Sequence, residues 1–471
     1  MGFALRLPFI GQAYENRAIQ VSNQKCINWY PEIESDNSRN VITLQSVSGS
    51  REFANVSLNP DDAIRGMVFA VADNKLYFVA GSTLYSSDSS GVTTSLGNID
   101  GSGLVSMAEN SNAQIAIATG SSYWVYDSSG LDKITDAGRV SDLAFQDGYI
   151  ALIETNSDVF KITSDTDARV INPVDFVATG ANPDKLVGIV QSERRLWLFG
   201  SNSIEIFYNS GAAAFPFTRV DGGSSNGFGL AGKDAKIVQD SVVYWLSNDG
   251  RIYLSNGYTP QRISHYGVEN SIRKYSDISD CECSQWTENG HKFIAFSFPT
   301  GNQTWVFDAT SAMWHERSSG VVGDGDVWRS RLNTRAWGKN LVGDRLSGVI
   351  GELDLELFTE YGNLMKAKRT SPVVHAEQKE FFTDRLEFLM ESGFTDEQNF
   401  EPTVNLRWSD DGGVTFGNWI KENLGKIGEY QERVVFRMLG QSVNRVYDLE
   451  ITSDVRRILI DCDVVGEVGD V

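Results

Sequence analysis

Residues 185–211 have the sequence KLVGIVQSERRLWLFGSNSIEIFYNSG, and this stretch decides the fold class of the chain. An apolar segment is followed by a second one in which Trp197 and Phe199 alternate with other side chains. A third segment alternates polar and apolar residues from Ser203 to Tyr208. Alternation with a period of two is typical of β-strands, and glycine between the segments suits tight hairpin turns. The stretch therefore predicts an antiparallel sheet of short strands.

The same unit recurs along the chain, with aromatic residues in its second strand and glycine or Asn-Asp-Gly at its turns. Its copies begin about every 35–45 residues, which is the spacing of propeller blades, and four antiparallel strands around an axis form one blade. We predict a β-propeller of six to seven blades over residues 62–365. A stacked sandwich would show the same strands, but the even spacing favours radial repetition. The copies lie at residues 65–96, 105–134, 140–163, 185–211, 233–264 and 291–319, with a weaker seventh at 328–357.

Both flanks of this region differ from it. Residues 1–61 are irregular and polar, and the aromatic stretch KCINWYPE (residues 25–32) predicts an extended N-terminal arm that packs within the chain or on a neighbour. After Leu364 a basic segment and Pro372 mark a break, and alternating stretches such as RLEFLME and VYDLEIT follow. These stretches predict a C-terminal β-sandwich over residues 366–471, so the whole chain is expected to be all-β.

The charge of the chain argues against general nucleic-acid binding. The formal net charge is −21 and the pI is about 4.7, whereas affinity for DNA comes mainly from Lys and Arg that neutralise phosphates. An acidic wall would repel DNA and let it slide past. Ordinary solubility explains the same charge, so the composition leaves both interpretations open.

The cysteines and the N-terminus predict neither a secreted scaffold nor a metalloprotein. Cys26, Cys281, Cys283 and Cys462 form no regular disulfide framework, and His291 is the only obvious further ligand near the middle pair. We therefore expect reduced, partly buried thiols and no metal site. The N-terminus lacks the pattern of a signal peptide, and no apolar run of about 18 residues predicts a membrane span. We expect a soluble protein made in a cytoplasm.

The sharpest local motif is SDDGGVTF at residues 409–416, which fits the Asp-box pattern S-x-D-x-G-x-T-F/W. In such a hairpin the carboxylate and hydroxyl groups bind backbone groups, glycine takes a positive φ and the aromatic ring packs beneath. Asp-boxes occur in sialidases, away from the active site and on several blades, but here the motif occurs once and outside the repeats. We predict a structural hairpin that uses Ser409, Asp411, Gly413, Thr415 and Phe416.

The remaining motifs give weak support for catalysis. The glycine-rich stretch at residues 222–229 lacks the Lys-Ser/Thr ending of a phosphate-binding loop, and we expect an inter-blade crossover there. It contains a G-x-S-x-G match around Ser225, but a nucleophile elbow needs a strand before the serine and a helix after it. The four histidines show no metal-binding or catalytic spacing. We predict a non-enzymatic protein with no catalytic, cofactor or metal site.

With the repeats in view, the chain resembles the packaged-DNA stabilisation proteins, or tail accessory factors, of short-tailed phages of enterobacteria. The likeness is carried by blade and turn residues over most of the chain from about residue 50 to the end. These residues are Ile64–Gly66 with LYFVAGSTLY (76–85), GSGLVSMA (101–108), LFGSNSIEIF (198–207) and the hairpin SDDGGVTFG (409–417).

The resemblance implies a structural tail hub, or nozzle, in the virion. In that family the hub is a homo-oligomeric ring, sixfold in the well-known tails, that closes the DNA channel below the portal. The ring sits on the adaptor protein, holds tail needle, tailspike or fibre proteins, and lets packaged double-stranded DNA pass without sequence-specific binding. The first residues of this chain depart from the family pattern, so the resemblance assigns no adaptor contacts. The alternatives are a carbohydrate-binding or sialidase-like propeller, on account of the Asp-box, and a peptide-binding scaffold.

Overall fold

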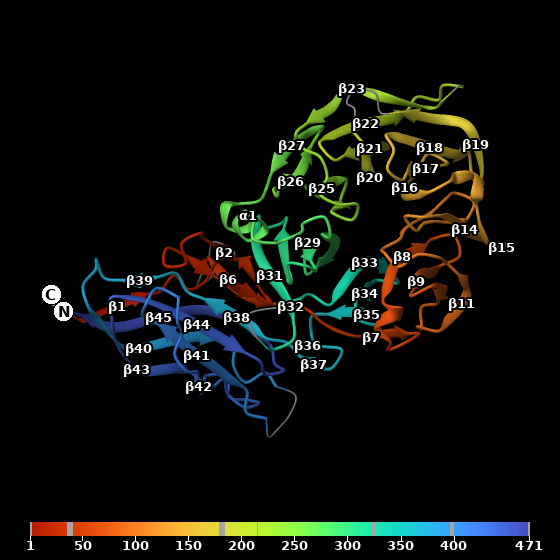
Figure 1. Ribbon diagram of the computed structural model, residues 1–471. Coiled ribbons are helices and arrows are strands. Elements are labelled where there is room, and N and C mark those ends of the chain that lie inside the picture. The colour runs from red at the N-terminus through yellow and green to blue at the C-terminus, as the bar shows by residue number, and fades with distance from the viewer. Residues whose placement is uncertain are drawn as a thin grey trace.

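The computed structural model describes residues 2–34, 41–178, 184–213, 215–322, 326–395 and 400–469. These residues are almost entirely β-strands (Figure 1). Within these ranges the one α-helix is α1 (Tyr266–Ile272), and the 3-10 turns are η1 (Pro60–Asp62) and η2 (Thr135–Ala137). No described helix combines the length and apolar character that a membrane crossing requires.

Seven antiparallel groups of four strands form the blades of a propeller: five are separate four-stranded sheets, and the last two are parts of larger sheets. Blade one contains β8 (Ile64–Ala70), β9 (Lys75–Ala80), β10 (Thr83–Ser87) and β11 (Thr93–Asn98). Blade two contains β12 (Ser106–Glu109), β13 (Ile115–Ala118), β14 (Tyr123–Asp127) and β15 (Gly130–Lys133). Blade three contains β16 (Val140–Gln146), β17 (Tyr149–Glu154), β18 (Val159–Ser164) and β19 (Asp167–Ala178). The next two are blade four with β20 (Leu186–Ser192), β21 (Arg195–Gly200), β22 (Ser203–Asn209) and β23 (Phe217–Asn226), and blade five with β24 (Lys236–Gln239), β25 (Val242–Leu246), β26 (Ile252–Asn256) and β27 (Thr259–Arg262). The last two are blade six with β28 (Glu282–Glu288), β29 (His291–Phe298), β30 (Gln303–Asp308) and β31 (Met313–Ser319), and blade seven with β33 (Ser330–Ala336), β34 (Lys339–Asp344), β35 (Val349–Asp354) and β7 (Gly49–Asn55).

The blades close into a complete ring. The first strands of successive blades contact one another in the order β8, β12, β16, β20, β24, β28 and β33, and β33 returns to β8. Figure 1 shows the blades arranged around a common centre. The predicted propeller is therefore confirmed, with seven blades.

Blade seven takes its outer strand from the N-terminal part of the chain. β7 pairs antiparallel with β35, from Asn55 opposite Val349 to Gly49 opposite Asp354. This is why the seventh repeat is weak in the sequence, since only three of its four strands lie near residues 328–357. Residues 49–55 thus belong to the propeller, which differs from the separate arm expected over residues 1–61.

The second domain is the predicted β-sandwich, and it also uses strands from the first 61 residues. One sheet has the order β43-β40-β45-β6-β5, with β1 also paired to β45. The facing sheet contains β4-β38-β44-β41-β42, with β39 also paired to β44. These strands are β1 (Gly2–Arg6), β4 (Cys26–Ile27), β5 (Trp29–Ile33), β6 (Ile42–Ser46), β38 (Ala367–Thr370), β39 (Val374–His375), β40 (Phe381–Met390), β41 (Thr403–Ser409), β42 (Ile420–Asn423), β43 (Val434–Ser442), β44 (Asn444–Ile451) and β45 (Leu459–Val468).

The two domains share hydrogen-bonded sheet and hydrophobic core. β4 pairs with β31 of blade six on one side and with β38 of the sandwich on the other, so one sheet runs through both domains. Buried side chains of blades five and six, such as Trp245 and Trp314, lie in the same hydrophobic cluster as Phe436 and Tyr447 of the sandwich. The propeller and the sandwich therefore form one continuous structure. Short strands β2 (Tyr14–Glu15), β3 (Asn23–Gln24), β32 (Asp326–Val327), β36 (Thr359–Glu360) and β37 (Asn363–Leu364) complete the fold.

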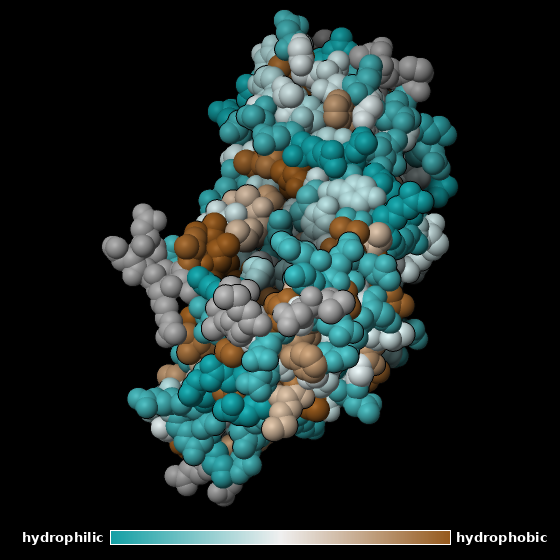
Figure 2. Space-filling model, turned by 90° about the vertical axis from the view of Figure 1, so that its left-hand side faces the viewer, coloured by the Kyte–Doolittle hydropathy of each residue, from teal (hydrophilic) through white to brown (hydrophobic). Residues whose placement is uncertain are grey.

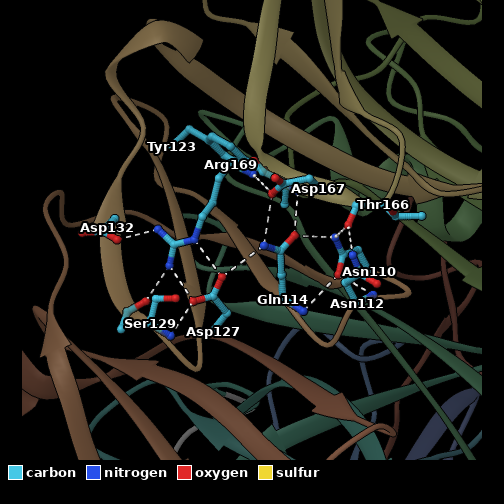
Figure 3. Close-up of polar contacts among 12 residues, drawn as sticks. Asn110, Asn112, Gln114, Tyr123, Asp127, Ser129, Asp132, Thr166, Asp167 and Arg169 are labelled. Carbon is cyan, nitrogen blue, oxygen red and sulfur yellow. Dashed lines mark hydrogen bonds and ion pairs between the residues drawn. The ribbon is translucent and has the colours of Figure 1, made fainter.

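Polar side chains hold blades two and three together at their outer strands (Figure 3). The guanidinium of Arg169 on β19 donates to both carboxylate oxygens of Asp127 on β14, at 2.7 and 2.8 Å, and to Asp132 at 2.5 Å. Gln114 donates to Asp127 at 3.1 Å and to Asp167 at 3.2 Å. The Arg169 contact lowers the pKa of Asp127, so the carboxylate stays charged at neutral pH.

Candidate interaction sites

The predicted Asp-box forms a hairpin between β41 and β42 of the sandwich. Asp411 accepts hydrogen bonds from the backbone amides of Val414 and Thr415 at 2.8 and 2.9 Å, and from the hydroxyls of Ser409 and Thr415 at 2.5 and 2.6 Å. These donors hold the pKa of the Asp411 carboxyl well below its usual range. Gly413 has φ 97°, which explains the glycine at this position. The polar groups of the motif thus bind its own backbone.

The aromatic residue of the motif packs on an arginine. The guanidinium of Arg407 lies between the rings of Phe416 and Trp419, 4.6 and 4.4 Å from their centroids. Arg407 also donates two hydrogen bonds to Asp448, at 3.0 and 2.9 Å, and Lys368 lies 3.0 Å from the same carboxylate. The cation–π contacts and the ion pairs fix the hairpin on the sheet.

The neighbouring Asp410 extends this support to the opposite sheet. It accepts a hydrogen bond at 2.7 Å from Arg445, whose side chain is 1% exposed. Arg445 also donates to the carbonyls of Leu439, Gly440 and Gln441 at 2.8, 3.2 and 3.0 Å. The hairpin therefore holds the end of β43 in place through the buried guanidinium of Arg445.

Charged side chains also fill the centre of the propeller. Asp142 on β16 is 3% exposed and lies 2.6 Å from the ammonium of Lys236 on β24, two blades away. Asp142 also accepts from Ser106 of blade two at 2.5 Å and from the amide of Ile189 of blade four at 2.9 Å. The Lys236 side chain passes over Gly188 on β20, where an added Cβ would lie 2.9 Å from its ammonium nitrogen. One carboxylate thereby ties four blades together.

A second lysine crosses the centre of the ring. Lys233, just before blade five, donates at 2.8 Å to the carbonyl of Leu104, which lies between blades one and two. The connection that carries Leu104 is held by Arg65, which donates to the carbonyls of Gly103 and Gly81, both at 2.7 Å. Among the residues that the structure describes, side chains therefore bridge the centre of the propeller at this level.

A sialidase would need an arginine cluster and a tyrosine–glutamate pair, and the structure places two arginines near Tyr361 and Glu360. Tyr361 lies against the guanidinium of Arg329, with Glu360 and Arg317 nearby. Arg317 is 3% and Glu360 is 4% exposed, and Arg329 donates to both oxygens of Asp344 at 2.7 and 2.6 Å. Burial raises the pKa of the Glu360 carboxyl. Arg317 and Glu360 are thus enclosed, whereas Arg329 and Tyr361 are half-buried.

His291 lies at the junction of the two domains. Its Nδ1 is 2.8 Å from Asp308 on β30, and its Nε2 contacts Glu32 on β5 of the sandwich. The hydrogen bond to Asp308 and the two negative charges raise the pKa of His291. By contrast, burial lowers the pKa of His315 to about 3. His291 therefore takes part in an ion-pair contact between blade six and the sandwich.

The four cysteines and the glycine-rich stretch around Ser225 belong to the folded framework of the protein. All four cysteines are buried free thiols, and the described residues contain no cluster of three potential metal ligands. The glycine-rich stretch was expected to be a crossover, but its first residues, including Ser225, lie in strand β23 of blade four. A strand forms because Ile204 and Glu205 of β22 pair with Ser225 and Ser224. No helix follows Ser225, so the structure does not form a nucleophile elbow there.

The structure brings together residues that the sequence did not single out. Asp142 and Lys236 are far apart in sequence and carry no motif. Basic residues from Arg445 to Arg457 alternate with apolar ones, a pattern that predicts the outer face of a strand for Arg445. Arg445 is instead buried against β43 and the Asp-box. A basic residue that alternates with apolar ones gives no sequence signal that distinguishes these two positions.

The sandwich surface carries two hollows lined by aromatic and charged side chains. One hollow of about 490 Å³ is lined by Leu389, Phe394, Tyr430 and Ile458, and a second of about 780 Å³ shares Phe394 and Tyr430 and extends to Ile427. Figure 2 shows the face at the left of Figure 1, where hydrophobic patches are separated by hydrophilic surface. Exposed apolar groups of this kind are typical of protein contacts.

Together, the closed seven-bladed ring, the fused sandwich and the internally satisfied polar clusters define an architectural all-β protein. Family comparison agrees with both domains. The β-propeller model of bacteriophage P22 Gp10 matches residues 6–357, and the β-sandwich model of the same protein matches residues 366–467. The chain belongs to this family of phage packaged-DNA stabilisation proteins. No curated protein sequence matches it.

Solved structures give distant similarities. The computationally designed Ika8 protein is 13% identical, with a TM-score of 0.40 over 70% of this chain and 100% of that chain. The extracellular domain of a putative hybrid two-component system from B. thetaiotaomicron is 10% identical, with a TM-score of 0.43 over 74% and 44%. The WD40 domain of Neurospora crassa Pan2 is 8% identical, with a TM-score of 0.42 over 64% and 95%.

Proposed function

We propose that the chain is the structural hub, or nozzle, of a short-tailed phage tail. Several copies form a ring, with six as the expected number, that extends and closes the DNA channel below the portal and adaptor. The ring retains packaged DNA in the virion and attaches needle, tailspike or fibre proteins. Membership of the Gp10 family over both domains is the observation that carries this proposal.

The propeller geometry supports a channel between chains. The side chains of Lys233 and Lys236 reach across the propeller centre to Leu104 and Asp142, at 2.8 and 2.6 Å, and a duplex whose major groove alone is about 12 Å wide would not pass where they meet. DNA therefore runs beside the propellers, along the axis of the ring of copies. The net charge of −21 favours sliding, since an acidic wall does not hold phosphates.

The role requires no catalysis. The Asp-box carboxylate is saturated by its own hairpin, and Arg317 and Glu360 beside Tyr361 are buried. These two observations favour an architectural role over a sialidase-like one. Incubation with a fluorogenic sialoside is expected to release no fluorophore, and release that disappears in a Tyr361→Phe variant would support the enzyme instead.

Assembly on the adaptor tests the proposal. The purified chain is mixed with preformed adaptor rings and examined by electron microscopy and light scattering. We expect rings of this chain on the adaptor, including when the chain alone is monomeric, because a template can shift the equilibrium. A chain that remains monomeric with the adaptor at high concentration would contradict the proposal.

A further inference from the structure

Met438 protrudes from the sandwich edge strand β43. Its side chain is 88% exposed, more than any other large hydrophobic residue that the structure describes. Its backbone has φ 58°, in the left-handed region that side chains other than glycine seldom adopt. A large apolar residue held outward in such a conformation indicates a contact site.

The backbone around Met438 is fixed from inside. The pairing of β40 and β43 shifts register between Thr383 and Arg385, so Met438 and Leu439 form a bulge opposite Asp384. Buried Arg445 donates to the three carbonyls that follow Met438, and Asp410 of the Asp-box hairpin holds Arg445. The Asp-box therefore supports the bulge that presents Met438.

Arginines flank this protrusion although the chain as a whole is acidic. Arg437 lies directly opposite Arg385 across the two strands, an arrangement that is unfavourable for like charges. Arg385 reaches Glu387 only at 3.8 Å, and Arg433 already binds both oxygens of that carboxylate at 2.6 Å. We call Met438 with Arg385 and Arg437 the knob. Its tip is apolar and two arginines flank it, while the exposed Asp384 lies opposite the bulge on the facing strand.

The surface around Phe394 and Tyr430 is hollow and acidic, whereas the knob protrudes and is flanked by arginines. The two rings lie 5.1 Å apart and are 47% and 62% exposed, and they separate the cavities of about 490 and 780 Å³. We call this region the socket. Its charged lining residues are Glu34, Glu356, Glu391 and Asp454, against one arginine, Arg456.

We propose that the knob of one copy seats in the socket of a second copy of this chain. Met438 would contact the Phe394 and Tyr430 rings, since a flexible thioether packs well on aromatic edges. Arg437 and Arg385 would face the acidic rim, so the charges of the two patches are complementary. Because knob and socket are different patches, a pair of copies joined by one contact retains one free socket on the first copy and one free knob on the second, the arrangement that closes rings. This inference rests on the proposed ring assembly.

Engineered cysteines can test the contact. All four native cysteines are buried, so new disulfides between chains are expected to form through the engineered ones. Chains with Met438→Cys are mixed with Phe394→Cys chains on adaptor rings, and disulfide-linked dimers are followed on non-reducing gels. Val71→Cys on blade one, where the native side chain is 77% exposed, replaces Phe394→Cys as the matched control. We expect Met438→Cys to link to Phe394→Cys about tenfold faster than to Val71→Cys, as high effective concentration requires.

Charge variants sharpen the test. Adding Arg437→Glu to the Met438→Cys chain is expected to slow linkage several-fold, and Glu391→Arg in the Phe394→Cys chain is expected to restore part of it. Rings that form with no preference for Phe394→Cys would overturn the knob-and-socket contact and leave the proposed function standing. Absence of rings with the native chain would overturn both.

Discussion

Blades one to five are each built from one continuous segment of chain, whereas blade seven and the sandwich combine strands from opposite ends. Blade one spans Ile64–Asn98, but the last blade pairs β7 near the N-terminus with β35, and the sandwich pairs β1 with β45. The N-terminal segment thus closes the propeller and also enters the neighbouring domain. Local repeats therefore build most of the ring, whereas its closure depends on pairing between strands that are far apart in the sequence.

The largest expected effect comes from the N-terminal segment. Trp29 on β5 is fully buried, and its Nε1 donates to the carbonyl of Arg457 at 2.8 Å. We expect Trp29→Ala to lower the free energy of unfolding by about 3–5 kcal/mol. Urea unfolding followed by tryptophan fluorescence measures this. Ile33→Ala on the same strand, where the side chain is 48% exposed, is expected to change it by less than about 0.5 kcal/mol. Equal losses would refute the structural role of Trp29.

A similar effect is expected at the propeller centre. Asp142→Ala leaves the ammonium of Lys236 buried without its carboxylate, and we expect a loss of about 3–5 kcal/mol. The double variant Asp142→Leu with Lys236→Met removes both charges and should be more stable than Asp142→Ala alone. Thermal and urea unfolding of the three proteins compare these energies. A double variant at least as unstable as the single one would contradict the pairing.

The contact between blades two and three is more exposed and should matter less. Arg169 is 20% exposed and Asp127 is 14% exposed. We expect Arg169→Met to lower the free energy of unfolding by about 1–2 kcal/mol, because solvent screens part of the interaction. Arg194, 81% exposed beside Asp147, provides the control: Arg194→Met should have no measurable effect. Indistinguishable variants would argue against the interblade network.

His291 predicts a pH dependence of the contact between the domains. Asp308, Glu32, His315 and Tyr30 are titratable groups around it, and the two carboxylates raise its pKa in the folded protein. Its contribution is therefore fully present below the unfolded pKa of about 6.5 and is lost as the pH rises through the raised pKa. Thermal unfolding between pH 5 and pH 9 should show a fall in stability that His291→Gln removes. The same fall in the variant would assign it to other groups.

The smallest expected effect is an increase in stability when Met438 is replaced. Met438 has φ 58°, which glycine adopts without the strain of a side chain. We expect Met438→Gly to raise the free energy of unfolding by up to about 1 kcal/mol while it weakens ring assembly. Urea unfolding and light scattering measure the two properties. A variant that is less stable, or that assembles as well as the native chain, would contradict the role of Met438.

Features that depend on residues close together in the sequence could be predicted from it. Alternating aromatics such as Trp197 and Phe199 located the blades, and the Asp-box spacing located its hairpin. The pairing of β7 with β35 could not be predicted, because a strand of seven residues carries no mark of a partner nearly 300 positions away. The bridge from Lys236 to Asp142 was invisible for the same reason. Met438 gave no sequence signal, since its exposure depends on a bulge fixed by Arg445.

Electron microscopy of this chain assembled on adaptor rings, with and without DNA in the channel, tests the central claim most directly. The predicted result is a ring of several copies in which DNA density runs between the chains and each propeller centre remains crossed by side chains. DNA density along the axis of a single propeller, or adaptor rings that carry no ring of this chain, would contradict it.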